Sequence, residues 1–451
     1  MKLFNPFPLS NPSTAPAVFA FMVCAIAAMV GFSGSVAAQE SAPVLPEASQ
    51  ASVFLFNTSL FLISGMVVMF MAAGFCMLEV GLVRSKNAAT ICLKNIALYS
   101  IAGIMVWVFG YNLIYGISEG GFIGKFAFWS ASDGPAAQLE TGYAASSDWY
   151  FQMVFVATAA SIVSGTVAER VKLFPFLIFV ALLTGFIYPI QAGWVWGGGW
   201  LDARFDDFAG STLVHSTGGW AALAGALVLG SRKGKYENGR VSPMPGSSLP
   251  MATLGTFILW LGWFGFNGGS QLALGTIDDA ISVAGIFVNT NMAACAGVVT
   301  TIILTQLVYK KVDLTIVLNG AIGGLVAITA EPLQPEIWQA VLIGAVGGVI
   351  VTFAIPLLDK LKIDDVVGAI PAHLFCGIWG TLIVPWTNSG VTIVGQLTGI
   401  VAIGVYVFVV SYIIWMALKL TIGIRASEED EVGGLDKAEL GLEAYPEFAS
   451  N

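Results

Sequence analysis

The chain has 451 residues, of which 57% are hydrophobic and only 10% are charged. Soluble globular domains carry about 25% charged residues, so this composition excludes a soluble enzyme of the same length. Because roughly 20 apolar residues span a bilayer, the chain has room for about ten to twelve membrane spans. The formal net charge of −9 excludes the basic surface that binds nucleic acid.

Residues 1–38 have the pattern of a cleavable signal peptide. Lys2 precedes an apolar run through residues 19–29, and small residues follow at 36–38. A basic start, a short apolar run and a small-residue cleavage site are typical of a secretory signal. An uncleaved first helix is the alternative. Cleavage would leave the mature N-terminus outside the cell membrane.

Eleven apolar segments follow residue 50 and predict an all-α polytopic membrane protein. They lie at residues 54–80, 89–116, 149–168, 173–192, 209–230, 249–269, 281–308, 314–330, 337–358, 367–386 and 392–420. The cysteines fall within apolar stretches and have no metal-binding or paired spacing, so we expect neither a disulfide framework nor a metal site.

Basic residues predict the orientation of these segments. Loops after the first, third, fifth, seventh and ninth segments carry twelve Lys and Arg residues between Arg84 and Lys362, whereas the alternate loops carry only Lys125 and Arg204. Cytoplasmic loops retain Lys and Arg. We therefore expect eleven spans in the cytoplasmic membrane, with the N-terminus outside and the tail at 425–451 in the cytoplasm.

The two histidines of the chain indicate an internal repeat. His215 in the fifth segment follows Asp207 by eight residues, and His373 in the tenth follows Asp365 by the same spacing. Because five segments separate them, the two spans run in opposite directions, as in inverted-repeat transporters. The predicted organisation is a first half at 51–235, an inverted second half at 248–386 and an added helix at 391–424.

The repeat places both histidines near the middle of the bilayer. A helix rises about 1.5 Å per residue, so eight residues correspond to about 12 Å from each face of a core about 30 Å thick. At that depth His215 and His373 could touch. The structural alternatives are a lone histidine bonded to a neighbouring helix and an aspartate that only caps its helix.

A pair of imidazoles in an apolar pore has two capabilities. The rings can share a hydrogen bond while offering polar edges to a small solute, and they can pass a proton. Ionisable residues inside membranes usually mark a transport pathway or a proton relay. Two histidines without a carboxylate or cysteine nearby make a poor metal site, so we predict no metal and no cofactor.

Several segments carry a recognisable pattern. They are Asp207–His215 with Gly218-Gly219, Ala224-Gly225 and Gly230–Arg232, together with Gly81–Asn87, Ala168–Arg170, Trp196–Gly199, Trp263–Ser270, Asp364–His373 and Cys376–Gly380. This pattern resembles that of the ammonium transporter family (Amt, Mep and Rhesus proteins) over essentially the whole mature chain. The resemblance implies eleven spans in inverted halves, a homotrimer, and ammonium transport rather than enzymatic activity.

The resemblance also implies roles for individual residues. His215 and His373 correspond to the twin histidines of the pore, which relay a proton. The other correspondences are Phe151, Phe155, Trp196 and Ser270 for the external ammonium site, Phe155 and Phe266 for the stacked phenyl gate, and Asp207 for support of the site without contact to the ion.

Physical chemistry agrees with these roles. The aromatic rings of Trp196 and Phe155 attract a cation by about 0.5 to 2 kcal/mol, and Ser270 can accept a hydrogen bond from ammonium. An intact charge in an apolar lumen costs at least several kcal/mol. Deprotonation beyond the site, with the proton passed along the histidines, lowers this barrier. Potassium has no proton to give and is excluded.

The tail resembles the family's cytoplasmic tail, which docks PII-type signal proteins. It begins with four acidic residues at 428–431, and we expect it to pack on the basic loop at 232–240. This sequence differs from the residues that are frequent in the family at Gly368, at Gln191 and at Leu440. For the function of the whole protein, the alternatives to a transporter are an ammonium sensor of the same fold that signals through its tail, and an intramembrane enzyme or metal-dependent oxidoreductase.

Overall fold

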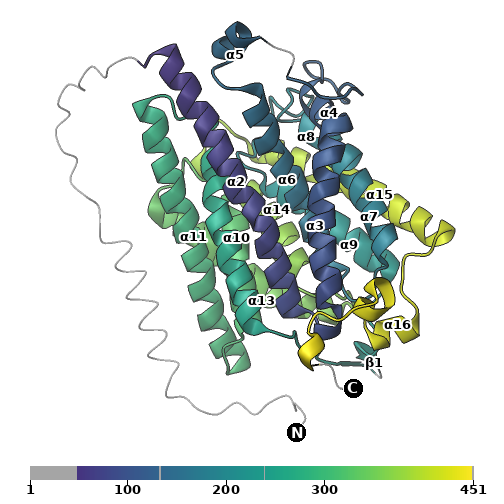
Figure 1. Ribbon diagram of the computed structural model, residues 1–451. Coiled ribbons are helices and arrows are strands. Elements are labelled where there is room, and N and C mark those ends of the chain that lie inside the picture. The colour runs from purple at the N-terminus through teal and green to yellow at the C-terminus, as the bar shows by residue number, and fades with distance from the viewer. Residues whose placement is uncertain (1–47, 132–133, 238, 449–451) are drawn as a thin grey trace.

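The structure is a computed structural model that describes residues 48–131, 134–237 and 239–448. The predicted signal peptide at 1–38 lies outside the described residues. The described chain forms a bundle of long helices that run side by side (Figure 1). The short helix α5 lies at one end of the bundle, and α16 and strand β1 lie at the opposite end. These are called the α5 end and the α16 end.

Helices account for nearly all of the regular structure among these residues. In chain order, with η marking 3₁₀ or π-helical turns, the helical elements are α2 (Gln50–Leu82), η1 (Ser85–Asn87), α3 (Ala88–Met105), η2 (Val106–Gly110), α4 (Tyr111–Tyr115), α5 (Pro135–Thr141), α6 (Ala145–Thr166), α7 (Leu173–Leu182), η3 (Leu183–Ile187), α8 (Tyr188–Gly193), η4 (Ser211–Ser216), α9 (Thr217–Leu229), α10 (Leu249–Gly269), α11 (Ile277–Tyr309), α12 (Leu314–Ile328), α13 (Ile337–Lys360), η5 (Ile370–Phe375), α14 (Cys376–Thr387), α15 (Ile393–Thr421), α16 (Glu428–Gly433), η6 (Asp436–Leu440) and η7 (Pro446–Phe448). Strands β1 (Tyr236–Glu237) and β2 (Arg240–Val241) form one antiparallel hairpin.

The helices agree with an all-α polytopic membrane fold. Within the described part of the chain, eight helices are long and apolar enough to cross a membrane. Shorter apolar helices lie at Leu314–Ile328 and Ile370–Trp386, and α6 adds 22 helical residues. A helical element therefore lies at each of the eleven segments expected from the sequence, with ends that differ by a few residues.

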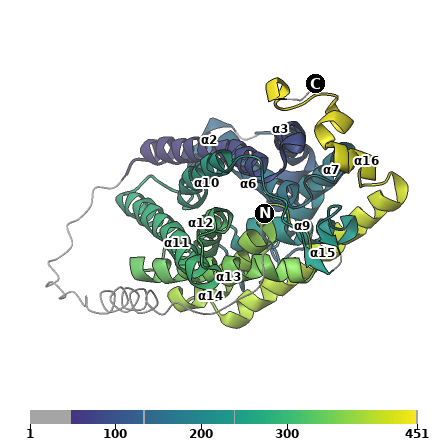
Figure 2. The same cartoon turned by 90° about the horizontal axis from the view of Figure 1, so that it is seen from below.

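Small residues allow the helices to pack closely. Helix α2 packs along α10 and α6, and α11, α12 and α13 form a neighbouring group (Figure 2). A Cβ atom at Gly81 would lie 2.4 Å from the backbone nitrogen of Ala252, and one at Gly255 would lie 2.3 Å from that of Leu78. Only glycine fits at such contacts, which is the usual reason for glycine between membrane helices.

A buried ion network holds the α16 end together. The guanidinium of Arg84 lies 2.5 Å from the Glu169 carboxylate, and that of Arg232 lies 3.3 Å from it. Arg232 also pairs with Asp364 at 2.8 Å. Arg170, buried beside them, donates to the backbone oxygens of Gly230 and Asp364. Four segments of the family-like pattern thus meet in a structural network.

The arginines keep both carboxylates ionised. Burial raises the pKa of Glu169, but the positive charges of Arg232 and Arg84 lower it by a larger amount. The pKa of Glu169 therefore lies below its ordinary value. Burial acts in the same direction on Asp364, and Arg170 and Arg232 hold its pKa well below the ordinary value. A lowered pKa stabilises the fold above the unfolded-state pKa of about 4. This stabilisation is lost as the pH falls through the lowered values.

We expect Asp364→Asn to lower the free energy of unfolding by about 3 kcal/mol, because breaking a buried ion pair leaves the guanidinium of Arg232 with less compensation. Thermal or denaturant unfolding in detergent measures this change. Glu428→Gln is the matched control, since the Lys233–Glu428 pair has side chains 49% and 69% exposed and such pairs contribute up to about 1 kcal/mol. Equal effects of the two variants would contradict a stabilising role for the network.

The C-terminal tail folds back on the same end of the bundle. The backbone N–H of Lys233 donates to Glu431 at 2.6 Å, so the expected contact with the 232–240 loop is present. The tail also caps α3, which the sequence did not predict. The Asp436 carboxylate accepts the N–H groups of Ala89 at 2.9 Å and Thr90 at 2.7 Å. A helix N-terminus leaves such N–H groups unpaired, and an acidic side chain is favourable there.

Candidate functional site

Each of the two histidine-bearing spans begins with a capping aspartate. The Asp207 carboxylate accepts the backbone N–H groups of residues 210–213 at 2.7 to 3.1 Å. Asp365 accepts the N–H of Ile370 at 2.7 Å. The capping alternative for these aspartates is therefore correct. It is also consistent with the predicted role of Asp207, which supports the site from within the protein.

The loop between each aspartate and its helix requires glycine. Gly210 and Gly368 both have left-handed backbone, with φ values of 105° and 80°. Glycine adopts such φ values without strain, whereas most residues with a side chain do not. Because the helical turns begin at Ser211 and Ile370, the stretch from each aspartate to its histidine is partly loop, and the rise of about 1.5 Å per residue applies only to its helical part. The depth of the histidines in the bilayer stays a prediction.

Both histidines lie on π-helical turns, η4 and η5. Such turns leave main-chain carbonyls free for other partners and are frequent at functional sites. The side-chain amide of Gln191 donates to the Leu213 carbonyl of η4 at 2.8 Å. Gln191, which differs from the residue frequent in the family, therefore bonds to this turn. The turn at η4 forms without a proline, so Pro371 is not needed to explain the matching turn at η5.

The two histidines touch, as the repeat predicted. Their Nδ1 atoms lie 3.2 Å apart, and the residues are 0% and 2% exposed. The ring of His215 stacks on Trp263, with centroids 4.9 Å apart and an interplanar angle of 17°. Its Nε2 atom is buried and has no hydrogen-bond partner among the described residues.

A stacked pair of phenyl rings covers the histidines. Phe155 and Phe266 have ring centroids 4.0 Å apart and an interplanar angle of 25°, and the Phe266 centroid lies 5.2 Å from that of His215. The stack separates the histidine pair from a cavity at the α5 end. Phe155 and Phe266 are the two residues that the family resemblance assigned to a stacked gate, and their rings do stack.

The cavity at the α5 end, called the outer cavity, has a volume of about 330 Å³. Its lining includes all four residues predicted to bind ammonium, namely Phe151, Phe155, Trp196 and Ser270. The Ser270 hydroxyl donates to the Phe266 carbonyl at 2.8 Å, which leaves the lone pairs of its oxygen free to accept a hydrogen bond. The Trp196 indole donates to the Asp207 carbonyl at 3.1 Å, which fixes the orientation of its ring.

Sequence reasoning missed several residues of the outer cavity. Tyr111, Tyr143, Asp148 and Gln152 also line it. Asp148 precedes Phe151 by three residues on α6, a spacing that places both side chains on one helix face. That signal was available in the sequence, whereas the tyrosines come from other segments and had no such signal.

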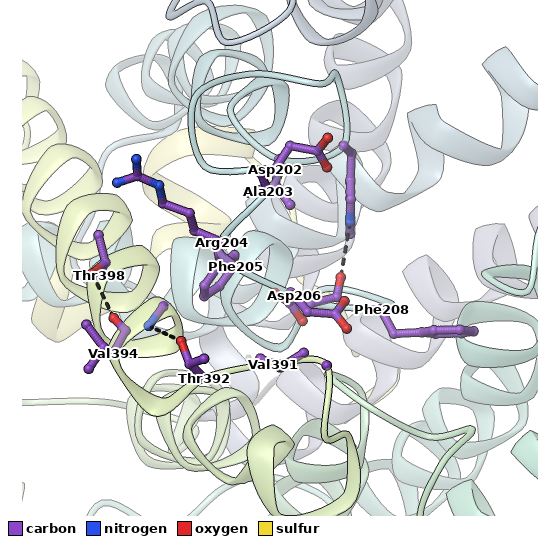
Figure 3. Close-up of a pocket in the computed structure, with 15 residues that line it drawn as sticks. Asp202, Ala203, Arg204, Phe205, Asp206, Phe208, Val391, Thr392, Val394 and Thr398 are labelled. Atoms are coloured by element: carbon purple, nitrogen blue, oxygen red, sulfur yellow. Dashed lines mark hydrogen bonds between the residues drawn. The ribbon is translucent and has the colours of Figure 1, made fainter.

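A second, wider pocket shares Trp196 and Phe208 with the outer cavity. It has a volume of about 620 Å³ and lies between the loop at 202–208 and the start of α15. Figure 3 shows the side chains of Asp202, Arg204 and Asp206 around it. Nearer the α16 end, a third cavity of about 310 Å³ is lined by Asn319, Asp365 and Pro371, among others.

Comparison with known proteins assigns a family. A model described as the Ammonium Transporter Family matches residues 59–445. Ammonium transporter Amt2 of Archaeoglobus fulgidus is 39% identical over 421 residues, which cover 86% of this chain and 87% of that protein. Ammonium transporter 1 member 1 of Arabidopsis thaliana is 33% identical over 415 residues, or 82% of each chain.

Solved structures of similar sequence agree with this family assignment. A structure titled Sensor Amt Protein is 34% identical, with a TM-score of 0.81, and the alignment covers 86% of this chain and 99% of that one. Mep2 of Candida albicans is 26% identical with a TM-score of 0.75, covering 85% and 89%. The family consists of transporters rather than enzymes. A match of this extent establishes that the chain belongs to the ammonium transporter family.

Proposed function

We propose that this protein carries ammonium across the cytoplasmic membrane, with ammonium bound in the outer cavity and deprotonated before it reaches the histidine pair. The observation that carries the proposal is the contact between His215 and His373 directly behind the stacked rings of Phe155 and Phe266. An apolar gate followed by two facing imidazoles suits a neutral solute and a separately transferred proton.

The chemistry of each part of the proposed pathway favours either ammonium or ammonia. Aromatic rings and the Ser270 oxygen bind a cation that carries N–H donors. The phenyl stack and the buried histidines offer no charge to balance an ion, so ammonium passes them as ammonia. The proton moves through the hydrogen bond between the imidazoles, one ring accepting as the other donates.

The architecture that we propose rests on the apolar segments, the spacing of the two histidines and the distribution of charge. Eleven spans cross the membrane in two inverted halves, 51–235 and 248–386, with the added helix at 391–424. The concentration of basic residues in alternate loops supports a cytoplasmic α16 end and an outer cavity that faces outside, after removal of a signal peptide at 1–38. Family resemblance supports a homotrimer, surrounded by membrane lipids, with one pore in each protomer.

We predict that His215→Ala or His373→Ala abolishes selective ammonium transport, because each removes one side of the only imidazole contact. Ammonium-evoked current from protein reconstituted on a supported membrane measures transport. Size-exclusion profiles in detergent serve as the control for folding and assembly. Wild-type currents in both variants would contradict the proposed relay.

We predict that Trp196→Leu raises the ammonium concentration at half-maximal current by about tenfold, because it removes a cation–π contact worth about 0.5 to 2 kcal/mol. Trp338→Leu is the matched control, since Trp338 is exposed at the start of α13 and should transport as the wild type does. Unchanged saturation and unchanged exclusion of potassium in the Trp196 variant would place the binding site elsewhere.

The tail at 425–451 is proposed to regulate transport together with a PII-type signal protein at the cytoplasmic face. Its contacts support this role, because Asp436 and Glu431 tie it to the N-terminus of α3 and to the loop at Lys233. Lys86 also donates to the Val432 carbonyl, and Asn87 accepts the N–H of Leu435, so a partner that displaces the tail must replace these contacts. A solvated appendage without a role is the competing interpretation.

We predict that deletion of 427–451 leaves assembly intact but weakens PII binding or changes its effect on flux. Asp436→Asn should act in the same direction, since it removes the charge that caps α3, whereas Glu447→Gln, at an exposed position, should have no effect. Co-purification with a PII trimer and flux in its presence measure both properties. Unaltered PII binding and unaltered flux in the truncated protein would identify the tail as an appendage.

An ammonium sensor is the second candidate function. It is favoured by the likeness to the structure titled Sensor Amt Protein, at 34% identity. A sensor binds ammonium without sustained transport. Saturable binding to purified protein with no ammonium-evoked current would therefore select the sensor, and a sustained current selects the transporter.

A further inference from the structure

An acidic side chain lies inside the outer cavity, among the residues proposed to bind ammonium. Asp148 is in the first turn of α6, one helical turn before Phe151, and is only 6% exposed. It lines the same cavity as Phe155, Trp196 and Ser270. Its carboxylate is therefore part of the surface that an ion in this cavity meets.

The carboxylate is oriented by two neutral donors. The Tyr111 hydroxyl donates to Oδ2, and the Gln152 side-chain amide donates to Oδ1 at 3.2 Å. An ionised carboxylate has about four acceptor positions, so two donors leave acceptor capacity unused. Among the described residues, Asp148 forms no ion pair.

A buried carboxylate without a cation is unfavourable, because two neutral donors do not replace the water that it loses. Here the missing cation has room to bind. The outer cavity has a volume of about 330 Å³, and a water molecule occupies about 30 Å³ of liquid. A small, partly hydrated cation fits beside the carboxylate and against the aromatic rings.

The other acidic side chains at this end are less suited to the same role. Asp207 is already occupied by the backbone N–H groups of residues 210–213. Asp206 accepts from Asn388 and lines the wider pocket, which also holds the cation of Arg204. Asp148 differs from both, because it lies in the cavity that also contains the gate residue Phe155.

We propose that Asp148 is a direct ligand of the cation in the outer cavity, where its carboxylate supplies the counter-charge that sets the affinity for ammonium. The inference rests on the proposed transport function and adds a charged ligand to the aromatic site. Aromatic rings alone attract any small cation weakly. A carboxylate at a fixed position adds a charge-assisted hydrogen bond to the N–H donors of ammonium.

The effect should appear in affinity rather than in maximal rate, because Asp148 acts before the gate. We expect Asp148→Asn, which keeps the shape and removes the charge, to raise the half-saturating ammonium concentration at least tenfold. The maximal current should stay within about twofold of the wild type. Asp148→Glu restores the charge and should return the half-saturating concentration to within about threefold of the wild type.

The matched control is Glu140→Gln, which removes a charge from the exposed helix α5 at the same end of the bundle. It should leave the half-saturating concentration within twofold. A similar shift in Glu140→Gln would mean that general surface charge, not a ligand, is responsible. Wild-type saturation in a folded Asp148→Asn protein, or equal behaviour of the Asn and Glu variants, would also overturn the proposal.

A second measurement uses the unaltered protein and so does not depend on the folding of a variant. Thallium(I), a monovalent cation with strong anomalous scattering, should bind in crystals of the wild type within about 4 Å of the Asp148 carboxylate, the range of an ion pair. Anomalous density that is absent from this position would overturn the proposal. The transport function is tested separately by the current of the wild type and its loss in the histidine variants.

Discussion

The close crossing of two helices determines the rest of the pore. The span of η4 and α9 meets that of η5 and α14 at Gly219 and Gly377, each four residues after a histidine. A Cβ atom at Gly219 would lie 2.8 Å from the nitrogen of Leu374, and one at Gly377 would lie 2.3 Å from the carbonyl oxygen of Ser211. No larger residue fits at either point. This approach is what brings the two imidazoles within hydrogen-bond distance.

The same residue types recur at the same spacing in the two histidine-bearing spans. This repetition is why much of the histidine region could be predicted from the sequence. Each span has an aspartate eight residues before the histidine and a left-handed glycine five residues before it. The pattern predicted a contact between His215 and His373, and the contact is present. The spacing alone does not reveal that a capped loop, rather than helix, follows each aspartate.

Tertiary contacts set the limit of sequence reasoning. Arg84, Glu169, Arg232 and Asp364 are far apart in the chain, and only the fold brings them into one ion network. Asp436 and the N-terminus of α3 are also far apart in the chain, and only the fold brings them into contact. In contrast, the helices were predictable, because apolar length determines which segments cross a membrane. The ends of the helices were less predictable, because capping and π-helical turns shift these ends by several residues.

The cost of desolvating charge explains the order of layers along the pore. In the proposed mechanism, aromatic rings and the Asp148 carboxylate at the α5 end bind an ion that still keeps part of its water. At the stack of Phe155 and Phe266 neither water nor counter-charge is provided, so an ion that cannot lose its charge meets the full barrier. Ammonium, unlike potassium, has N–H donors and a proton to give. Selectivity for ammonium therefore requires the proposed cation site and the histidine contact to lie on opposite sides of the gate. The outer cavity and the histidine pair do lie on opposite sides of the Phe155–Phe266 stack.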